Sequence, residues 1–221
     1  MNAILSSKWS KVFVFLLCLV PFGLLFHRFY LAQWGGQLDA LTANPQQFIE
    51  HYTGDWVLLF LVFTLCITPL RKIPGLSALI RYRRMLGLYA FFYVCLHFTT
   101  WLALDRYFDW SQMVDDISKR PYITVGFTAF VLLIPLAITS TAGWIRRLGG
   151  KRWNRLHKLI YVSAVLGVIH YYWLVKSDVR KPVAYGIVIG LLLAWRLVFW
   201  LKNKKPPQKA PVRAASPSTP A

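Results

Sequence analysis

The sequence predicts an all-α integral membrane protein, a bundle of six transmembrane helices with both termini in the cytoplasm. Composition, long charge-free stretches and a one-sided distribution of charge predict it. The chain has 221 residues, of which 57% are apolar or aromatic and only 15% are charged, and its mean hydropathy is +0.46. An average soluble domain carries roughly 25% charged residues, so this chain has too few to cover a water-facing surface. Its length allows about six spans of ~20 residues and leaves no room for a separate soluble domain.

Six stretches of the sequence are long and apolar enough to be spans. Lys and Arg side chains that flank the shorter stretches extend them to spanning length by placing their charged groups in the headgroup layer. Continuous apolarity without in–out alternation favours helices over a barrel. The predicted spans cover residues 12–29, 55–70, 85–104, 121–141, 156–175 and 182–201. The last residues, 202–221, are rich in Lys, Pro, Ala and Ser and predict a disordered, basic cytoplasmic tail.

The distribution of charge predicts the orientation of the chain. The ends and loops expected on one side hold 19 of the 26 Lys and Arg residues and no acidic residue. The opposite side holds the other 7 basic residues and all eight acidic ones. Because basic loops stay in the cytoplasm, both termini are predicted to lie there. The net charge of +18 therefore reflects topology and contact with membrane lipid, and it does not indicate nucleic-acid binding.

Two histidines fall at the same depth in two predicted spans. His97 lies 13 residues after Arg84 and His170 lies 12 residues after Lys158, and both basic residues mark the cytoplasmic border. At 1.5 Å per residue, both imidazoles are about 18–20 Å into a hydrocarbon core of about 30 Å. Two imidazoles at one level suit axial ligation of a single haem iron, whereas a bare zinc site needs more protein ligands. For either histidine alone, a hydrogen-bonded helix contact is the alternative.

The other three histidines lie near the predicted membrane borders. His157 is at the cytoplasmic border of the same predicted span as His170. It lies about 20 Å below His170 and is turned ~140° from it around the helix. Its partner at equal depth would fall near Arg83 or Arg84, so a second bis-histidine haem is not supported. His157 is a candidate single axial ligand, a contact of a flavin or a propionate, or a structural group. His27 and His51 lie at or beyond the outer border and are expected to be solvated.

Basic residues alternate with aromatic ones in the loops. Arg83, Arg84, Arg152 and Trp153 suit an anionic planar ligand such as flavin mononucleotide, with its phosphate on arginine and its ring on tryptophan. Contact with anionic lipid headgroups is the alternative. On the outer side, Arg120 suits a haem propionate. The sequence has no G-x-G-x-x-G motif and no cytoplasmic segment above about 25 residues, which excludes a nicotinamide-binding domain.

Five segments between about Phe48 and Trp200 match a known pattern. They are residues 81–89 (RYRRMLGLY), 96–99 (LHFT), 119–122 (KRPY), 151–157 (KRWNRLH) and 169–173 (IHYYW). Together they resemble the MsrQ (YedZ) family, the haem-binding membrane subunits of the bacterial methionine sulfoxide reductase system. That family belongs to the wider ferric-reductase-like transmembrane group.

The resemblance implies cofactors, partners and site residues. It implies a b-type haem and a flavin mononucleotide, and the three haem-associated histidines of the family fall on His97, His157 and His170. It also implies electron delivery through the bacterial inner membrane to a periplasmic molybdopterin enzyme that reduces methionine sulfoxide in proteins. Larger relatives with two haems have a fourth histidine, and the corresponding position here is basic.

The sequence therefore predicts a membrane b-type cytochrome in residues 1–201, with no complete substrate site and no catalytic residue of its own. Electrons are expected to enter from a cytoplasmic flavin reductase or from quinol and to leave toward a soluble periplasmic partner. One alternative is a quinol-oxidising cytochrome b anchor of another periplasmic oxidoreductase. The other is a small transporter or scaffold with no redox role, against which the charge-free interiors of the predicted spans argue.

Overall fold

The structure, a computed structural model, describes residue 5, residues 7–37 and residues 39–203. Every regular element within this part of the chain is a helix. Most of the predicted cytoplasmic tail, residues 204–221, lies outside the described residues. Five helical segments are long and apolar enough to cross a membrane: α2 (Lys8–Gln33), α3 (Pro45–Leu70), the continuous segment Ser77–Asp105, α6 (Pro121–Ile138) and α9 (Arg180–Lys202).

The fifth predicted span, 156–175, contains the shorter helix α8 (Leu159–Leu174). Its 16 residues give a length of about 24 Å, less than the ~30 Å of a hydrocarbon core. The prediction of six spans therefore rests on this apolar helix, and five helices meet the length criterion without it.

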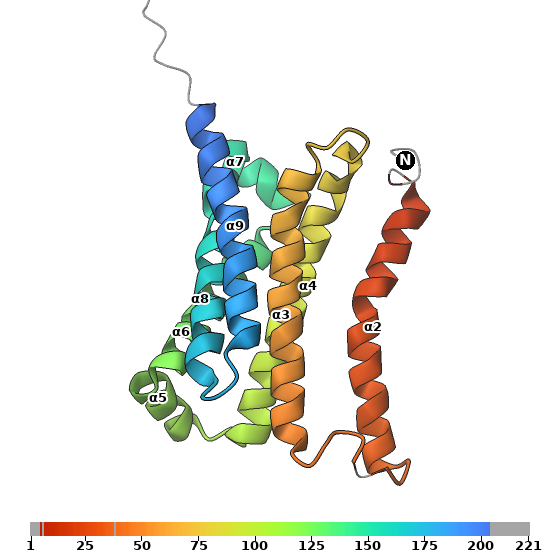
Figure 1. Ribbon diagram of the computed structural model, residues 1–221, viewed down its shortest axis with the longest axis vertical. Helices are drawn as coiled ribbons and strands as arrows, with labels where there is room; N and C mark the ends of the chain where they lie inside the picture. The colour runs from red at the N-terminus through yellow and green to blue at the C-terminus, as the bar shows by residue number, and fades with distance from the viewer. Residues whose placement is uncertain (1–4, 6, 38, 204–221) are drawn as a thin grey trace, which may run out of the picture.

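The helices form one bundle, in which α3 has a central place (Figure 1). The helix α3 packs against α4 (Arg83–Thr100), α8 and α9, and α6 packs against α8. The helix α2 stands at the edge of the bundle beside α4. The first residues of α2 and the last residues of α9 lie at the same end of the bundle. We call this end, which also holds the start of α4, the basic end, and the opposite end the outer end.

The helix α3 begins ten residues before the predicted span 55–70, which adds Glu50 and His51 to the helix. The Asn44 side chain accepts a hydrogen bond from the amide of Gln47 (3.1 Å), and Pro45 occupies the first helical position. Glu50 and Asp55 both line a cavity inside the bundle, and Asp55 also pairs with Lys181 of α9 (2.9 Å).

Two segments that lie between the predicted spans are helical: α5 (Trp110–Lys119) and α7 (Ala142–Leu156). Asp109 caps α5 by accepting hydrogen bonds from the hydroxyl and amide of Ser111 and from the amide of Gln112, which lower the pKa of Asp109. The helix α7 is divided by Gly149, whose φ of 72° and ψ of 149° only glycine adopts readily. Both segments carry several charged residues, so they lack the continuous apolarity that predicts a span.

Tyrosine hydroxyls from α4 attach α2 to the bundle. The Tyr89 hydroxyl donates to the carbonyl of Phe15 (2.8 Å). The Tyr93 hydroxyl accepts from the amide of Phe22 (3.0 Å) and donates to the carbonyl of Cys18 (3.0 Å). The hydroxyl is thus inserted into the i to i−4 hydrogen bond of α2, so polar contacts supplement the apolar packing of this edge helix.

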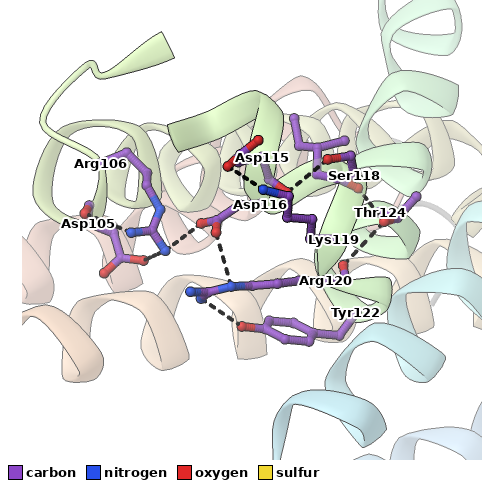
Figure 2. Close-up of polar contacts among 10 residues, drawn as sticks. Asp105, Arg106, Asp115, Asp116, Ser118, Lys119, Arg120, Tyr122 and Thr124 are labelled. Atoms are coloured by element: carbon purple, nitrogen blue, oxygen red, sulfur yellow. Dashed lines mark hydrogen bonds and ion pairs between the residues drawn. The ribbon is translucent and has the colours of Figure 1, made fainter. Parts of the chain in front are cut away.

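An ion-pair network fixes α5 to the outer end of the bundle (Figure 2). Asp116 on α5 pairs with Arg106, and its other oxygen lies 3.0 Å from Nε of Arg120. Arg106 also pairs with Asp105 (3.5 Å), at the end of the turn η2 (Trp101–Asp105). Only 10% of the Asp116 side chain is exposed, so one carboxylate joins the end of η2, α5 and the start of α6.

Replacing Asp116 with asparagine should lower the free energy of unfolding by about 2 kcal/mol. Breaking a buried pair costs about 3–5 kcal/mol, and the partial exposure of Arg120 reduces this. The matched control is Asp115→Asn, because Asp115 pairs with Lys119 on the surface, where such pairs contribute about 0.2–1 kcal/mol. Unfolding by titration with a denaturing detergent measures both. Equal stability of the two variants would contradict the role given to Asp116.

Candidate haem site

A largely apolar cavity of about 310 Å³ lies between α3, α4, α6 and α8. Its deeper wall consists of aliphatic and aromatic side chains, including Leu61, Val94, Phe98, Phe130 and Leu133. Both His97 on α4 and His170 on α8 line it. The π-helical turn η2 follows α4 directly and adds Trp101 and Asp105 to the wall. A π-helical turn of this kind is frequent at functional sites.

The two histidines are held by hydrogen bonds from the same ring atom. Nδ1 of His97 lies 3.1 Å from the carbonyl oxygen of Glu50 and 3.3 Å from the Thr53 hydroxyl. Nδ1 of His170 lies 2.7 Å from the carbonyl oxygen of Tyr122. A carbonyl oxygen only accepts, so Nδ1 carries the proton in both rings and Nε2 keeps its lone pair. Metal-binding histidines in proteins are oriented in this way.

The spacing of the two rings fits one metal ion between them. Their centroids are 6.2 Å apart and their planes make an angle of 76°. A metal–nitrogen bond of about 2.0 Å, added to about 1.1 Å from nitrogen to ring centre, places two opposed ring centres about 6 Å apart. An edge-to-face ring contact has a similar separation. The Nδ1 hydrogen bonds favour ligation, because they leave both Nε2 atoms available.

The protein ligands around this point suit a porphyrin better than a bare ion. Among the residues that the structure describes, no group of three or more His, Cys, Asp or Glu side chains is placed to hold a metal ion. His97 and His170 would therefore suit an iron that is carried in a non-protein group, as in haem. The apolar walls suit the porphyrin faces.

Two glycines make room for the histidine rings. A Cβ atom on Gly126 of α6 would lie 2.6 Å from Nδ1 of His170, which is closer than real Cβ contacts. A Cβ atom on Gly54 of α3 would lie 3.3 Å from Cε1 of His97. Both histidine positions thus depend on a glycine in a neighbouring helix. The sequence alone did not predict these two glycines as part of the site.

The outer end of the cavity is polar. Glu50, Asp105 and Tyr122 line it, and so does His51. The expectation that His51 is solvated is therefore wrong: its ring is half-buried, 6.2 Å from the ring of Tyr171. The early start of α3 explains the difference, because it places His51 on a helix that faces the cavity. One Glu50 carboxylate oxygen and the indole nitrogen Nε1 of Trp101 are buried there without a hydrogen-bond partner in the described structure.

His157 lies apart from this cavity, at the junction of α7 and α8. Its Nε2 is 3.0 Å from the Thr139 hydroxyl, and its ring stacks on that of Trp153 with centroids 3.8 Å apart. The Trp153 indole donates to the carbonyl of Thr139 (2.8 Å). Arg83 begins α4, which also starts at the basic end. The structure thus brings His157 and Trp153 into direct contact at the end of the bundle that holds Arg83.

The remaining predicted site residues are on the surface. Arg84 and Arg152 are exposed at the basic end, and neither lines the histidine cavity. Arg120, predicted to contact a propionate, is bound by Asp116 and donates to the hydroxyl of Tyr122 (3.4 Å). Tyr122 itself lines the cavity, so Arg120 stands one side chain away from it.

Comparison with known proteins identifies the family. Residues 53–168 match the family model described as ferric reductase like transmembrane component. A protein of Herminiimonas arsenicoxydans is 54% identical over 197 residues, which cover 88% of this chain and 87% of the relative. It is named protein-methionine-sulfoxide reductase heme-binding subunit MsrQ. The chain belongs to the MsrQ family.

Other MsrQ relatives match over almost the whole chain. Those of Xanthomonas euvesicatoria pv. vesicatoria and Xanthomonas campestris pv. campestris are 49% and 50% identical over 211 residues, which cover 96% of this chain and 95% of each relative. Both carry the same name as the Herminiimonas protein. The transmembrane family model and the five long apolar helices together show a multi-pass membrane protein.

Proposed function

We propose that this chain is the membrane cytochrome of a methionine sulfoxide reductase system and that His97 and His170 are the axial ligands of a b-type haem. The observation that carries the proposal is the pair of imidazoles, 6.2 Å apart, each bound through Nδ1 to a backbone carbonyl and each facing an apolar cavity. The names of the MsrQ relatives as haem-binding subunits support it.

The residues of the chain prepare this site before any cofactor binds. The carbonyls of Glu50 and Tyr122 select the tautomer and orientation of the two rings, and Gly126 keeps the space that His170 needs. The apolar walls exclude water and so influence the redox potential. Bound haem supplies one-electron transfer, and the protein supplies binding, orientation and electrostatics. The chain needs no catalytic residue for this role.

We further propose a six-span bundle in the bacterial inner membrane, with α8 as the fifth span and both termini cytoplasmic. The packing of α8 between α6 and α9 and the excess of Lys and Arg at the basic end support this topology. Electrons would then enter at the basic end from a cytoplasmic flavin reductase or from quinol. They would leave at the outer end toward a periplasmic molybdopterin methionine sulfoxide reductase subunit.

The basic end is the proposed site of a flavin mononucleotide. Arg83, Arg84 and Arg152 offer cations for its phosphate, and Trp153 offers an aromatic face for its ring. The stacking of Trp153 on His157 makes His157 a contact of the same cofactor, although a single axial ligand or a structural group remains an alternative role for it.

Replacing His157 with alanine should leave at least part of the bis-histidine spectrum. His157 bonds to Thr139 and stacks on Trp153 outside the cavity, so the change removes neither proposed iron ligand. Absorption spectra of the reduced and oxidised variant test this, and its flavin content tests the contact with a flavin. Complete loss of the low-spin haem spectrum in a correctly assembled variant would show that His157 belongs to the iron site.

A reduced-minus-oxidised absorption spectrum of the detergent-purified chain tests the proposed function. We expect the bands of a low-spin b-type haem and their loss when a purified periplasmic methionine sulfoxide reductase subunit oxidises the reduced chain. Haem bands that no such subunit can oxidise would favour the anchor of another oxidoreductase. A chain that assembles in the presence of haem and shows no haem bands would favour the transporter or scaffold alternative.

A further inference from the structure

The segment after the cavity carries an exposed apolar edge that the proposed haem site does not use. Tyr107, Phe108, Trp110 and Val114 form it, and we call these four residues the outer apolar edge. Tyr107 is 78% exposed, Trp110 68% and Val114 67%. A cluster of large exposed apolar side chains indicates an interaction site.

The helix α5 has three distinct faces. Met113 and Asp116 are buried against the bundle. At about 100° per residue, Trp110 and Val114 lie side by side on a second face, next to the buried one. The polar residues Ser111, Asp115, Ser118 and Lys119 occupy the third face. This distribution of apolar and polar residues is that of a helix lying in a membrane interface.

A backbone hydrogen bond and an ion pair hold the outer apolar edge in a strained conformation. Tyr107 and Phe108 both have positive φ, 45° and 61°, a conformation that is costly for bulky residues. Such strain persists only when the surroundings determine it. Here the amide of Phe108 donates to the carbonyl of Leu102 (3.1 Å), and Arg106 on one side is tied to Asp116 of α5 on the other. Both aromatic side chains are exposed, on a segment flanked by the ion pairs of Arg106 and Asp116 that Figure 2 shows.

We propose that the outer apolar edge is a lipid-binding surface that lies in the headgroup layer of the outer leaflet. Three observations favour lipid. The edge follows η2 directly in the chain, and Leu104 of η2 is likewise an exposed apolar residue of a segment that begins as a membrane-length helix. Tyr and Trp are enriched at membrane interfaces.

The charge of α5 is the third observation. Its two acidic residues and its one lysine nearly cancel, so its attachment relies on the apolar edge and suits zwitterionic lipid. Lipid contact there would keep the outer end of the cavity at the level of the headgroups, because η2 joins the cavity wall to this edge. The inference rests on the membrane location of the bundle and does not depend on the haem ligands.

The test compares two positions on the same helix in the full-length chain. Val114→Cys and Ser111→Cys are made in a background with Cys18, Cys66 and Cys95 replaced by alanine. Each is labelled with an environment-sensitive fluorophore and placed in phosphatidylcholine vesicles. We expect a nitroxide-labelled lipid to quench the label at position 114 at least twofold more than the label at 111, and aqueous iodide to show the opposite order.

Equal quenching at both positions, or greater iodide access at 114, would overturn the proposal and assign the edge to contact with a soluble protein. Where the cysteine-free background does not assemble, Trp110→Phe in the unmodified chain replaces it. Brominated lipid should then quench less tryptophan emission in the variant than in the parent chain. An unchanged quenched fraction would likewise overturn the proposal.

Discussion

Alanine in place of His97 or His170 is expected to abolish the low-spin bis-histidine spectrum of the haem-loaded chain. Each change removes one of the two imidazoles whose ring centroids lie 6.2 Å apart. The deeper wall of the cavity is aliphatic and aromatic and offers no axial nitrogen, and the lining residue His51 lies at the polar outer end with its ring against Tyr171. Absorption and electron paramagnetic resonance spectra of both variants measure the loss, which should be complete in either one.

Two controls separate ligation from a structural role. His27→Ala removes an exposed imidazole of α2 and should leave the spectrum unchanged. Free imidazole added to His97→Ala or His170→Ala should restore part of the low-spin signal, since it can enter the vacated space and bind iron. A spectrum that is unchanged in both alanine variants, without added imidazole, would refute the assignment of the ligands.

Gly126→Ala is expected to have the second largest effect, although it adds only one methyl group. The new Cβ would lie 2.6 Å from Nδ1 of His170 and 2.9 Å from its Cε1. The ring must therefore move and its hydrogen bond to the carbonyl of Tyr122 must weaken. We expect haem content to fall several-fold or the retained haem to become high-spin, as seen by absorption spectroscopy of the purified variant.

The matched control is Gly190→Ala on α9, because no heavy atom lies within 4 Å of the Cβ position there. It makes the same chemical change in a helix interior and should keep the parent spectrum. Since alanine favours helix by about 0.5–1 kcal/mol over glycine, it should also be slightly more stable. Identical spectra for Gly126→Ala and Gly190→Ala would show that the contact with His170 does not set the geometry of the site.

The pairing of His97 with His170 could be predicted from sequence because it depends on a simple regularity. Arg84 and Lys158 mark one membrane border, and the fixed rise per residue of a helix converts the spacing into depth. The structure places the two rings within 6.2 Å of each other. The ring partners could not be predicted, since the carbonyls of Glu50 and Tyr122 carry no sequence signal and lie on other helices.

The helices α5 and α7 and the first turns of α3 lie outside the predicted spans because those spans stop at or near charged residues. In α3, Glu50 and His51 line the cavity ahead of residue 55, so the helix extends beyond the predicted border. In α5 the N-cap residue Asp109, followed by Trp110 and Val114 at helical spacing, was a usable signal. The glycine contacts of His97 and His170 become visible only once the neighbouring helices are placed.

A structure of the haem-loaded chain in a lipid environment would test the central claim most directly. We expect one iron bonded to Nε2 of His97 and to Nε2 of His170, with both Nδ1 atoms still bound to the carbonyls of Glu50 and Tyr122. An iron bound by His157, or by only one of the two cavity histidines, would contradict the account.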